Sequence, residues 1–286
     1  MAVLVDRNTK LLIQGITGKQ ARNFLADIIK YGTKVVAGIS PGREGQEIES
    51  VPIYDSVRNA VKEHGANTAL VMVSGERAYD AVLEDINAGI HCIVCVADPV
   101  PVHHMLRLKW ILEDSESMLI GPNTPGVISP GKSKVGFMPS ASYSQGNMGV
   151  VSRSGSLSYE ICSRLTEGGI GQSTVIGIGG DPIQGLDMLT AVKLLDDDPE
   201  TSTIFLITEI GGEQEYGVAE AVSNGSIRKP VFAFIAGKHA PEGRKMGHTA
   251  ALISKRSESH AAKMKAMEKA GINVIRNLSD IVGAVS

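Results

Sequence analysis

Aromatic residues are scarce in this chain of 286 residues, where Phe, Trp and Tyr together make up 4%. Strands of all-β sandwiches are rich in aromatic side chains, so this scarcity disfavours that class of fold. Glycine, in contrast, occurs 32 times, and 43% of the residues are hydrophobic. The composition therefore favours a glycine-rich α/β enzyme, and the length suggests two domains of ordinary size.

The sequence also lacks a strong charge of either sign and a long apolar run. Its formal net charge is −3, so nothing indicates nucleic acid or another polyanion as a partner. No apolar run reaches the roughly 18–20 residues that span a bilayer. Residues 1–8 (MAVLVDRN) have no charged start followed by an apolar core and a cleavage site. We therefore expect a cytoplasmic protein that binds neither nucleic acid nor a membrane.

Cysteine is rare as well, and the three residues form no paired framework, which fits a reducing compartment. Cys92 and Cys95 have the C-x-x-C spacing of zinc and redox sites. They lie, however, in the apolar segment HCIVCV, which predicts a buried strand. Side chains three positions apart on a strand face opposite sides, so we expect no metal site here.

Short apolar segments alternate with helical segments through the first half of the chain. Strands are expected at residues 11–15, 34–39, 69–73, 91–96 and 117–121. Such strands between helices of ten or more residues indicate a parallel sheet covered on both faces. The sequence therefore predicts a Rossmann-like domain over residues 1–122.

A stretch rich in Pro, Gly, Ser and Asn separates this half from a second α/β series. We expect residues 123–146 to connect two domains and to include a hairpin. Strands are then expected at residues 149–152, 173–176, 203–207, 231–235 and 273–275, with helices such as 154–168 and 214–224 between them. Residues 147–286 should form a smaller doubly wound domain.

The turn Gly15–Gln20 joins the first expected strand to the first helix. Backbone N–H groups at such a helix start can hold a phosphate, and glycine allows close approach. The three-glycine dinucleotide fingerprint is incomplete, because Ala21 follows Gln20. A tight turn without a ligand is the alternative. Arg43, in the loop after the second strand, can pair with a phosphate at the same edge, or the loop can be simply solvated.

Three segments of the second half carry chemistry of another kind. Ser152–Ser156 (SRSGS) runs from a strand end into a helix, so it predicts either an anion site or an ordinary Ser N-cap. A serine nucleophile would need a G-x-S-x-G elbow, which the segment lacks. Glu209 ends a strand at the edge where α/β proteins place chemistry, although such a carboxylate is often only solvated. His248 has small neighbours that leave room for a group on its ring, and a structural histidine is the alternative.

In this order, the motifs resemble the α subunits of succinate–CoA ligases and the wider nucleoside-diphosphate-forming acyl-CoA synthetases. The resemblance covers essentially the whole chain. The segments that carry it are QGITG (14–18), YGTK (31–34), GPN (121–123), SRSG (152–155), GIGGDP (177–182), EIGG (209–212) and RKMGH (244–248).

The resemblance implies an α/β fold with an N-terminal CoA-binding Rossmann-like domain followed by a flavodoxin-like domain. It implies that His248 is phosphorylated and that Glu209 orients its ring. Ser154 and Gly155 would hold the phosphate, and Tyr159 would contact the substrate. The residues that would contact CoA are Thr17, Gly18, Lys19, Gln20, Arg43, Ala97 and Asp98.

The family's other substrates imply a second polypeptide. Mg²⁺ and ATP or GTP would bind a β subunit with an ATP-grasp fold, in an αβ or α2β2 assembly. This chain has no P-loop pattern G-x-x-x-x-G-K-[ST] that would bind the nucleotide itself. The implied reaction joins a small carboxylic acid to CoA through an acyl phosphate, with His248 carrying the phosphoryl group.

The chain departs from the family pattern mainly in its first half, at Ala21, Glu44 and residues 74–76 (SGE). Succinate is the default acid, and malate, citrate or another carboxylate is an alternative. A non-catalytic CoA-binding paralogue is a further alternative, motivated by Glu44 near the expected CoA phosphates. A nicotinamide-dependent oxidoreductase would need the complete G-x-G-x-x-G that the chain lacks.

Overall fold

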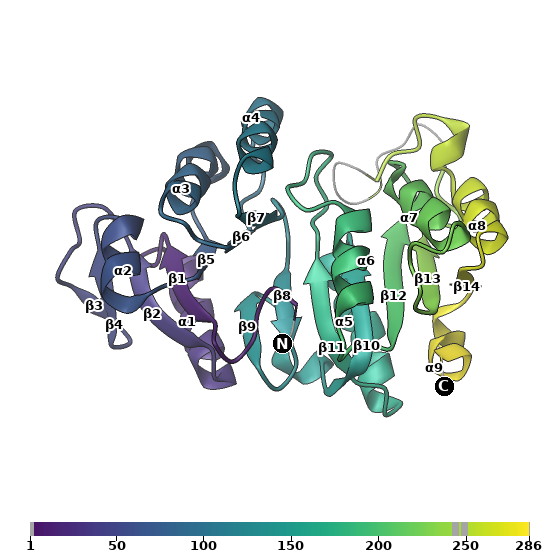
Figure 1. The fold of residues 1–286 in the computed structure, drawn as a ribbon, viewed down its shortest axis with the longest axis horizontal. Helices are drawn as coiled ribbons and strands as arrows, with labels where there is room; N and C mark the ends of the chain where they lie inside the picture. Colours follow the sequence, from purple (N-terminus) through teal and green to yellow (C-terminus); the bar gives the residue numbers. More distant parts are fainter. Residues whose placement is uncertain (1–2, 242–245, 247–250, 286) are drawn as a thin grey trace.

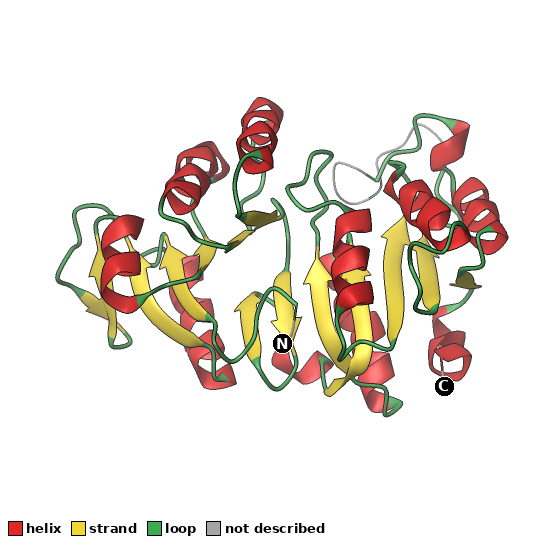
Figure 2. Cartoon of the chain, in the orientation of Figure 1, coloured by secondary structure: helices red, strands yellow, loops and turns green. Residues whose placement is uncertain are grey.

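Two mostly parallel β-sheets, each with helices on both faces, form the computed structural model of this chain (Figure 1). The structure describes residues 3–241, 246 and 251–285. We call the first sheet with helices α1–α4 the N-terminal lobe, and the second sheet with helices α5–α9 the C-terminal lobe. Figure 2 shows the two sheets side by side, with helices packed around each of them.

The first sheet has the strand order of a Rossmann fold. Its strands are β1 (Lys10–Gln14), β2 (Lys34–Ile39), β3 (Glu47–Ile48), β4 (Val51–Tyr54), β5 (Thr68–Val71), β6 (Cys92–Cys95) and β7 (Met118–Ile120). They lie in the order β3-β4-β2-β1-β5-β6-β7, and only β3 is antiparallel to its neighbour. Without β3 this is the order 3-2-1-4-5-6. The prediction of a Rossmann-like first half is confirmed.

Four helices cover the two faces of this sheet. They are α1 (Lys19–Tyr31), α2 (Val57–His64), α3 (Gly75–Asn87) and α4 (Val102–Glu113). The buried side chains of α1 pack into one core, whereas those of α2, α3 and α4 pack into another. Gly32 caps the end of α1, and its φ of 100° lies in the region that glycine adopts without steric cost.

The second sheet has the strand order of flavodoxin. Its strands are β8 (Gly126–Ser129), β9 (Ser133–Gly136), β10 (Gln145–Ser152), β11 (Gln172–Gly177), β12 (Thr203–Glu209), β13 (Val231–Ala236) and β14 (Asn273–Ile275). The five parallel strands lie in the order β11-β10-β12-β13-β14, which is the pattern 2-1-3-4-5. The prediction of a flavodoxin-like second half is confirmed. The hairpin expected within residues 123–146 is β8–β9, which extends this sheet beyond β11.

The helices of the C-terminal lobe also divide between two faces. They are α5 (Gly155–Glu167), α6 (Met188–Asp197), α7 (Gln214–Ser223), α8 (His260–Lys269) and α9 (Ile281–Val285), with short 3-10 helices η1 (Ser140–Ser142), η2 (Arg256–Glu258) and η3 (Leu278–Asp280). Buried residues of α5 and α9 share one core, and those of α6, α7 and α8 share the other. The parallel strands of this sheet therefore lie between two layers of helices, with α5 in one layer and α6 in the other.

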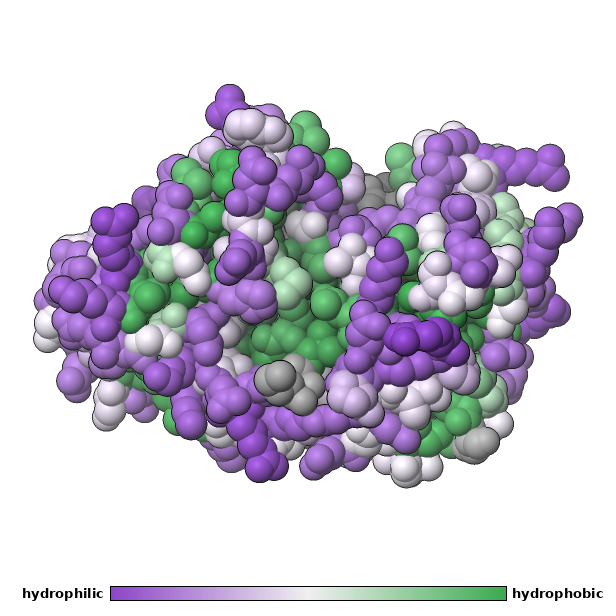
Figure 3. Space-filling model, viewed as in Figure 1, coloured by the Kyte–Doolittle hydropathy of each residue, from purple (hydrophilic) through white to green (hydrophobic). Residues whose placement is uncertain are grey.

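The two lobes are joined by a polar contact between α1 and the β8–β9 hairpin. The Lys134 ammonium, whose side chain is fully buried, forms an ion pair with Asp27 of α1 and donates to Ser140 Oγ (2.9 Å). Thr33 Oγ1 donates to the Lys134 carbonyl and accepts its N–H, both at 2.9 Å. One apolar core contains residues of both lobes. Figure 3 shows apolar residues gathered in the hollow between the lobes and hydrophilic residues over much of the surrounding face.

Cys92 and Cys95 are both buried on β6 and pack into different cores, as expected for strand side chains three positions apart. Burial raises the pKa of each thiol to about 12, so neither is a thiolate near neutral pH. Within the part of the chain that the structure describes, no group of three or more His, Cys, Asp or Glu side chains is placed to hold a metal ion. Among the same residues, no helix is long and apolar enough to cross a membrane.

Candidate active site

The polar segments of the second half meet at the carboxyl edge of the second sheet. Strand β10 ends at Ser152 and its neighbour β12 ends at Glu209. The chain continues from β10 to β11 on one side, whereas β12 lies on the other side, so this is the point where the strand order reverses. Open α/β sheets bind their ligands in the crevice at such a switch point. Ser152–Gly155 and Glu209 therefore occupy the position where this fold binds ligands.

The turn from β10 into α5 is shaped as an anion-binding helix start. Ser154 is the N-cap, and its Oγ accepts the Leu157 N–H at 3.4 Å. Ser152 Oγ accepts the Ser154 N–H (3.2 Å) and donates to the Ser154 carbonyl (2.7 Å). The N–H groups of Gly155 and Ser156 then have no acceptor within the helix. They and the positive end of the helix dipole suit a phosphate.

Tyr159 lies one turn further along α5, on the same side as Gly155. Its Oη would lie 3.6 Å from a Cβ added to Gly155, and the same Cβ would lie 3.3 Å from Pro125. The space above Gly155 is therefore narrow and lined by a phenol group. Burial raises the pKa of Tyr159, which keeps its hydroxyl protonated and able to donate.

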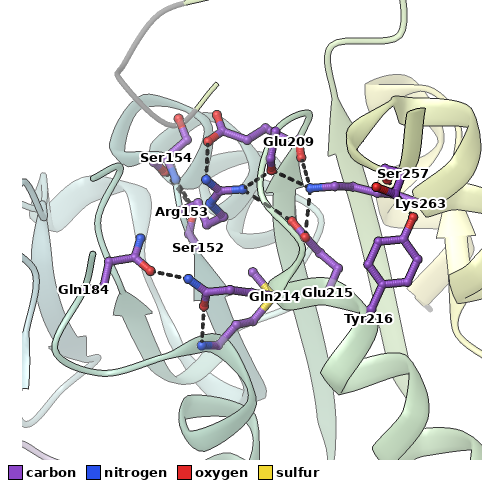
Figure 4. A network of polar contacts seen from close by, with 12 residues as sticks. Ser152, Arg153, Ser154, Gln184, Glu209, Gln214, Glu215, Tyr216, Ser257 and Lys263 are labelled. Carbon is purple, nitrogen blue, oxygen red and sulfur yellow. Dashed lines mark hydrogen bonds and ion pairs between the residues drawn. The ribbon is translucent and has the colours of Figure 1, made fainter. Parts of the chain in front are cut away.

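Glu209 is nearly buried and lies beside Arg153. Arg153 Nη2 is 3.6 Å from Glu209 Oε1, and Nη1 donates to the Gly211 carbonyl at 2.7 Å. Figure 4 shows the Arg153 guanidinium between the Glu209–Gly211 turn and Glu215. The turn itself needs glycine, because Gly211 and Gly212 have φ of 82° and 64°. A Cβ on Gly212 would also lie 3.4 Å from Arg153 Nη1.

His248 lies outside the described residues, so its place relative to Glu209 stays a prediction. The chain before it leaves the sheet at Ala236, the end of β13, whose carbonyl accepts the Ile210 N–H (3.1 Å). The chain after it is fixed beside the same turn, because the Glu258 carbonyl accepts the Gly211 N–H at 3.0 Å. Ala236 before His248 and Glu258 after it therefore accept hydrogen bonds from Ile210 and Gly211, the two residues that follow Glu209.

The segments expected to bind CoA meet at the corresponding switch point of the first sheet, between β1 and β5. Gly15 has φ of 76°, and a Cβ there would lie 2.7 Å from the Met72 carbonyl oxygen that follows β5. Thr17 Oγ1 is hydrogen-bonded to Ser40 Oγ at 3.0 Å, which joins the loops after β1 and β2. Gly18 is the N-cap of α1 and supplies no side-chain cap, and Lys19 and Gln20 are exposed. The first turn of α1 is therefore open to an anionic ligand.

Arg43 and Glu44 lie in an exposed loop that is shaped by Asp55. Asp55 Oδ1 accepts the N–H groups of both residues at 3.1 Å. Glu44 Oε2 in turn accepts the Asp55 N–H at 3.3 Å. The loop conformation therefore rests on backbone groups, and the Arg43 side chain is not needed to maintain it.

Ala97 and Asp98 follow β6 at the same edge of the sheet. Ala97 is buried, and its carbonyl accepts the Asn123 N–H at 3.1 Å, whereas Asp98 is exposed. Asn123 Nδ2 donates to Asp181 Oδ1 (2.9 Å), and its carbonyl accepts the Gly180 N–H (3.2 Å). The segments GPN and GIGGDP thus link the loop after β6 to the C-terminal lobe.

Sequence reasoning gave no role to three charged residues of this site. Glu215, on α7, and Lys263, on α8, form a buried ion pair of 2.8 Å directly behind the Glu209–Gly211 turn, and Arg153 also faces Glu215. The signal for Lys263 was weak: it lies four residues before the buried Met267, on the same face of α8. A single lysine on an otherwise polar helix does not indicate burial.

Two family models match this chain, one in each half. The family described as CoA binding domain matches residues 6–98, and the family described as CoA-ligase matches residues 151–273. These matches define the class of protein as an acid–thiol ligase subunit with a CoA-binding domain.

Relatives along the full chain identify the family. The chain is 47% identical over 285 residues to succinate–CoA ligase [ADP-forming] subunit alpha 1 of Archaeoglobus fulgidus, covering 100% of this chain and 97% of that protein. It is 46% identical over 283 residues to the succinate–CoA ligase [ADP-forming] subunit alpha of Aquifex aeolicus, covering 98% and 92%. The chain belongs to the family of succinate–CoA ligase alpha subunits.

A solved structure shows the same fold within a larger protein. ATP citrate lyase from Methanothrix soehngenii, solved in complex with citrate and coenzyme A, matches with a TM-score of 0.90 and 25% identity. The match covers 99% of this chain and 50% of that protein. This chain therefore spans half the length of the solved relative.

Proposed function

We propose that this chain is the alpha subunit of an ADP-forming succinate–CoA ligase that acts through a phosphohistidine at His248. The observation that carries the proposal is the position of the Ser152–Gly155 turn and Glu209 on neighbouring strand ends at a switch point. Near-full-length relatives named as succinate–CoA ligases support succinate as the acid and ATP as the nucleotide.

Each described side chain has a defined part in the proposed reaction. Glu209 accepts the N–H of one ring nitrogen of His248, which leaves the other nitrogen as the nucleophile. That nitrogen takes the terminal phosphoryl group of the nucleotide and releases the diphosphate. The N–H groups at the start of α5, after Ser154, stabilise the phosphoryl oxygens. The Tyr159 hydroxyl donates a hydrogen bond to the substrate carboxylate.

The second half of the reaction joins the two lobes. The carboxylate attacks the phosphoryl group, the P–N bond to His248 breaks, and an acyl phosphate forms. The CoA thiol then attacks the acyl carbon, and inorganic phosphate leaves. CoA would be held by the open start of α1 at Thr17, Gly18, Lys19 and Gln20, by Arg43, and by the loop at Ala97 and Asp98.

The nucleotide and Mg²⁺ belong, in this proposal, to a β subunit with an ATP-grasp fold, in an αβ or α2β2 assembly in the cytoplasm. The alpha-subunit names of the relatives support such a partner. We further propose the domain limits 1–122 and 147–286, joined by residues 123–146, whose hairpin β8–β9 adds to the sheet of the second domain. The separate matches to residues 6–98 and 151–273 support this division.

Citrate is the second candidate for the acid, because the structure of an ATP citrate lyase superposes on the chain along 99% of its length. The higher identity to succinate–CoA ligases favours succinate. The test is to reconstitute this chain with its β partner and offer succinate, malate and citrate separately with CoA, Mg²⁺ and ATP. We expect succinyl-CoA by mass spectrometry and no acyl-CoA from this chain alone. Citryl-CoA as the main product would show that the acid substrate is citrate and not succinate. Turnover by the single chain would show that the reaction needs no β subunit.

A further inference from the structure

The Glu209–Gly211 turn is held from behind by a buried cluster of four charges. We call Arg153, Glu209, Glu215 and Lys263 the buried charge cluster; none of the four side chains is more than 9% exposed. Two positive and two negative groups make the cluster neutral. Figure 4 shows the side chains converging on the turn, with Arg153 just after β10, Glu209 at the end of β12, Glu215 on α7 and Lys263 on α8.

Lys263 binds the backbone of the turn directly. Its Nζ donates to the Glu209 carbonyl (2.8 Å), to the Gly211 carbonyl (2.7 Å) and to Glu215 Oε2 (2.8 Å). These three acceptors use all three donors of an ammonium group. Burial lowers the pKa of Lys263, and the Glu215 carboxylate acts in the opposite direction. Lys263 is thus fully committed to this turn and is shielded from water and substrate.

Arg153 binds both the backbone and the side chain of the same turn. Nη1 donates to the Gly211 carbonyl and lies 3.6 Å from Glu215 Oε1, whereas Nη2 lies 3.6 Å from Glu209 Oε1. The planar guanidinium presents its N–H donors in a fixed fork, so Arg153 contacts the Gly211 carbonyl and both carboxylates at once. Arg153 therefore contacts the Glu209 carboxylate as well as the backbone of the turn.

We propose that Arg153 and Lys263 are positioning residues that fix the Glu209 carboxylate for phosphoryl transfer, with Glu215 as their counter-charge. The proposal rests on the function proposed above for Glu209. Neither residue touches the reacting atoms. A general structural role for a buried ion pair predicts only a loss of stability, whereas positioning predicts a loss of phosphoryl transfer that remains after stability is restored.

A charge-balanced pair of variants separates these two roles. Lys263→Met alone leaves a buried excess of negative charge and should lower the melting temperature of the complex. Adding Glu215→Gln restores the neutral cluster, so the double variant should recover most of that loss. It still lacks the Lys263 donor to the Glu209 and Gly211 carbonyls, although the Gly211 carbonyl keeps its hydrogen bond from Arg153 Nη1.

The first measurement is the rate of phosphoryl uptake by the reconstituted complex from labelled ATP. We expect the double variant to be slower by roughly 10- to 100-fold, with an unchanged Kd for CoA. Arg276→Met is the matched control, because Arg276 follows β14 and forms an exposed ion pair with Glu268 of the same helix α8, so its loss should leave the rate unchanged. Phosphoryl uptake by the double variant at the parental rate would overturn the proposal.

The second measurement is hydrogen exchange in the complex without nucleotide. Amides of residues 210–213 should exchange faster in the double variant than in the parental complex, and those of β10 should not change. Unchanged exchange at residues 210–213 would overturn the proposal. Failure of the parental complex to take up phosphate would count against the proposed function. In that case the hydrogen-exchange rates would still show whether Lys263 orders the turn.

Discussion

Lys134 on β9 and Asp27 on α1 form an ion pair across the junction of the two lobes. Helix α1 begins at the open turn proposed to hold CoA and ends at Tyr31, whose hydroxyl accepts the Gly131 N–H at 3.1 Å. The Lys134 ammonium also lies 5.4 Å from the centre of the Tyr31 ring. One helix therefore connects the CoA end of the N-terminal lobe to the sheet that carries Glu209.

Lys134→Met should uncouple the lobes without damaging either site. Asp27 is half exposed and returns to water, so we expect a fall in melting temperature of only about 2–5 °C. Phosphoryl uptake and the Kd for CoA should stay near parental values, while acyl-CoA formation slows because CoA and the acyl phosphate are less well aligned. Stopped-flow and single-turnover assays separate these steps. An unchanged rate of acyl-CoA formation would show that the ion pair has no part in alignment.

Arg43→Ala should weaken CoA binding by roughly 10- to 150-fold, the effect of removing one charge-assisted contact. Asp55 fixes this loop through backbone N–H groups, so the variant should keep the loop's shape. Isothermal titration calorimetry with CoA measures the loss, which should shrink as salt is added. An unchanged Kd for CoA would show that CoA does not contact this loop.

Glu44→Gln tests the acidic departure in the same loop. Glutamine keeps an acceptor for the Asp55 N–H and removes a negative charge near the expected CoA phosphates. CoA should therefore bind more tightly, by about 2- to 5-fold for one exposed charge. The matched comparison is Glu44→Gly, which removes both the charge and the contact with Asp55. Weaker CoA binding by Glu44→Gln would contradict this assignment.

Asp85 gives a prediction about stability and pH in the N-terminal lobe. Its carboxyl is fully buried on α3, and burial raises its pKa well above the usual value, opposed by the Gln14 amide. Because the folded-state pKa of Asp85 is raised, its contribution to the free energy of unfolding is most favourable below the pKa of the unfolded chain. This contribution is lost as pH rises through the folded-state pKa. Between the two pKa values, this group should lower the free energy of unfolding by up to about 1.4 kcal/mol per pH unit.

Asp85→Asn should consequently stabilise the protein at pH 8, and the gain should shrink as pH falls toward 4. Denaturant unfolding at several pH values measures this. The exposed Asp114, at the end of α4, is the control, since Asp114→Asn should give no comparable trend. A stability difference that does not vary with pH would show that Asp85 is not the source.

Much of the fold could be predicted because buried parallel strands have an unmistakable pattern. Segments such as Ala69–Val73 and Thr203–Ile207 are continuous apolar runs between helices, and the structure has strands β5 and β12 there. The Ser152–Gly155 turn and Glu209 were placed at strand ends for the same reason. The family resemblance assigned their roles, which periodicity alone does not.

The contacts between elements could not be read from the sequence. Lys134 lies in the short strand SKVG, and nothing in that pattern indicates that its ammonium is buried against α1. Arg153 belongs to a recognised motif, but its partner Glu215 is 62 positions further along the chain. Such pairings depend on how helices pack over a sheet edge, which local patterns do not encode.

Glu209→Gln keeps the size of the side chain and removes its charge. If Glu209 orients His248 and stabilises its positively charged ring, phosphoryl uptake should fall by roughly 10²- to 10⁴-fold. The Kd for CoA should not change, because CoA is expected to dock mainly on the N-terminal lobe. Rapid-quench assays with the reconstituted complex measure the rate. Phosphoryl uptake by Glu209→Gln at the parental rate would show that Glu209 does not take part in phosphoryl transfer.

The central claim is that this chain carries the phosphoryl group on His248, and covalent labelling tests it most directly. The complex with the β partner is incubated with terminally labelled ATP and Mg²⁺, and the labelled residue is located by mass spectrometry under alkaline conditions. We predict label on His248 that is stable to base, labile to acid and discharged by succinate with CoA, and no label in His248→Asn. Label on a serine, or label that persists in His248→Asn, would contradict the account.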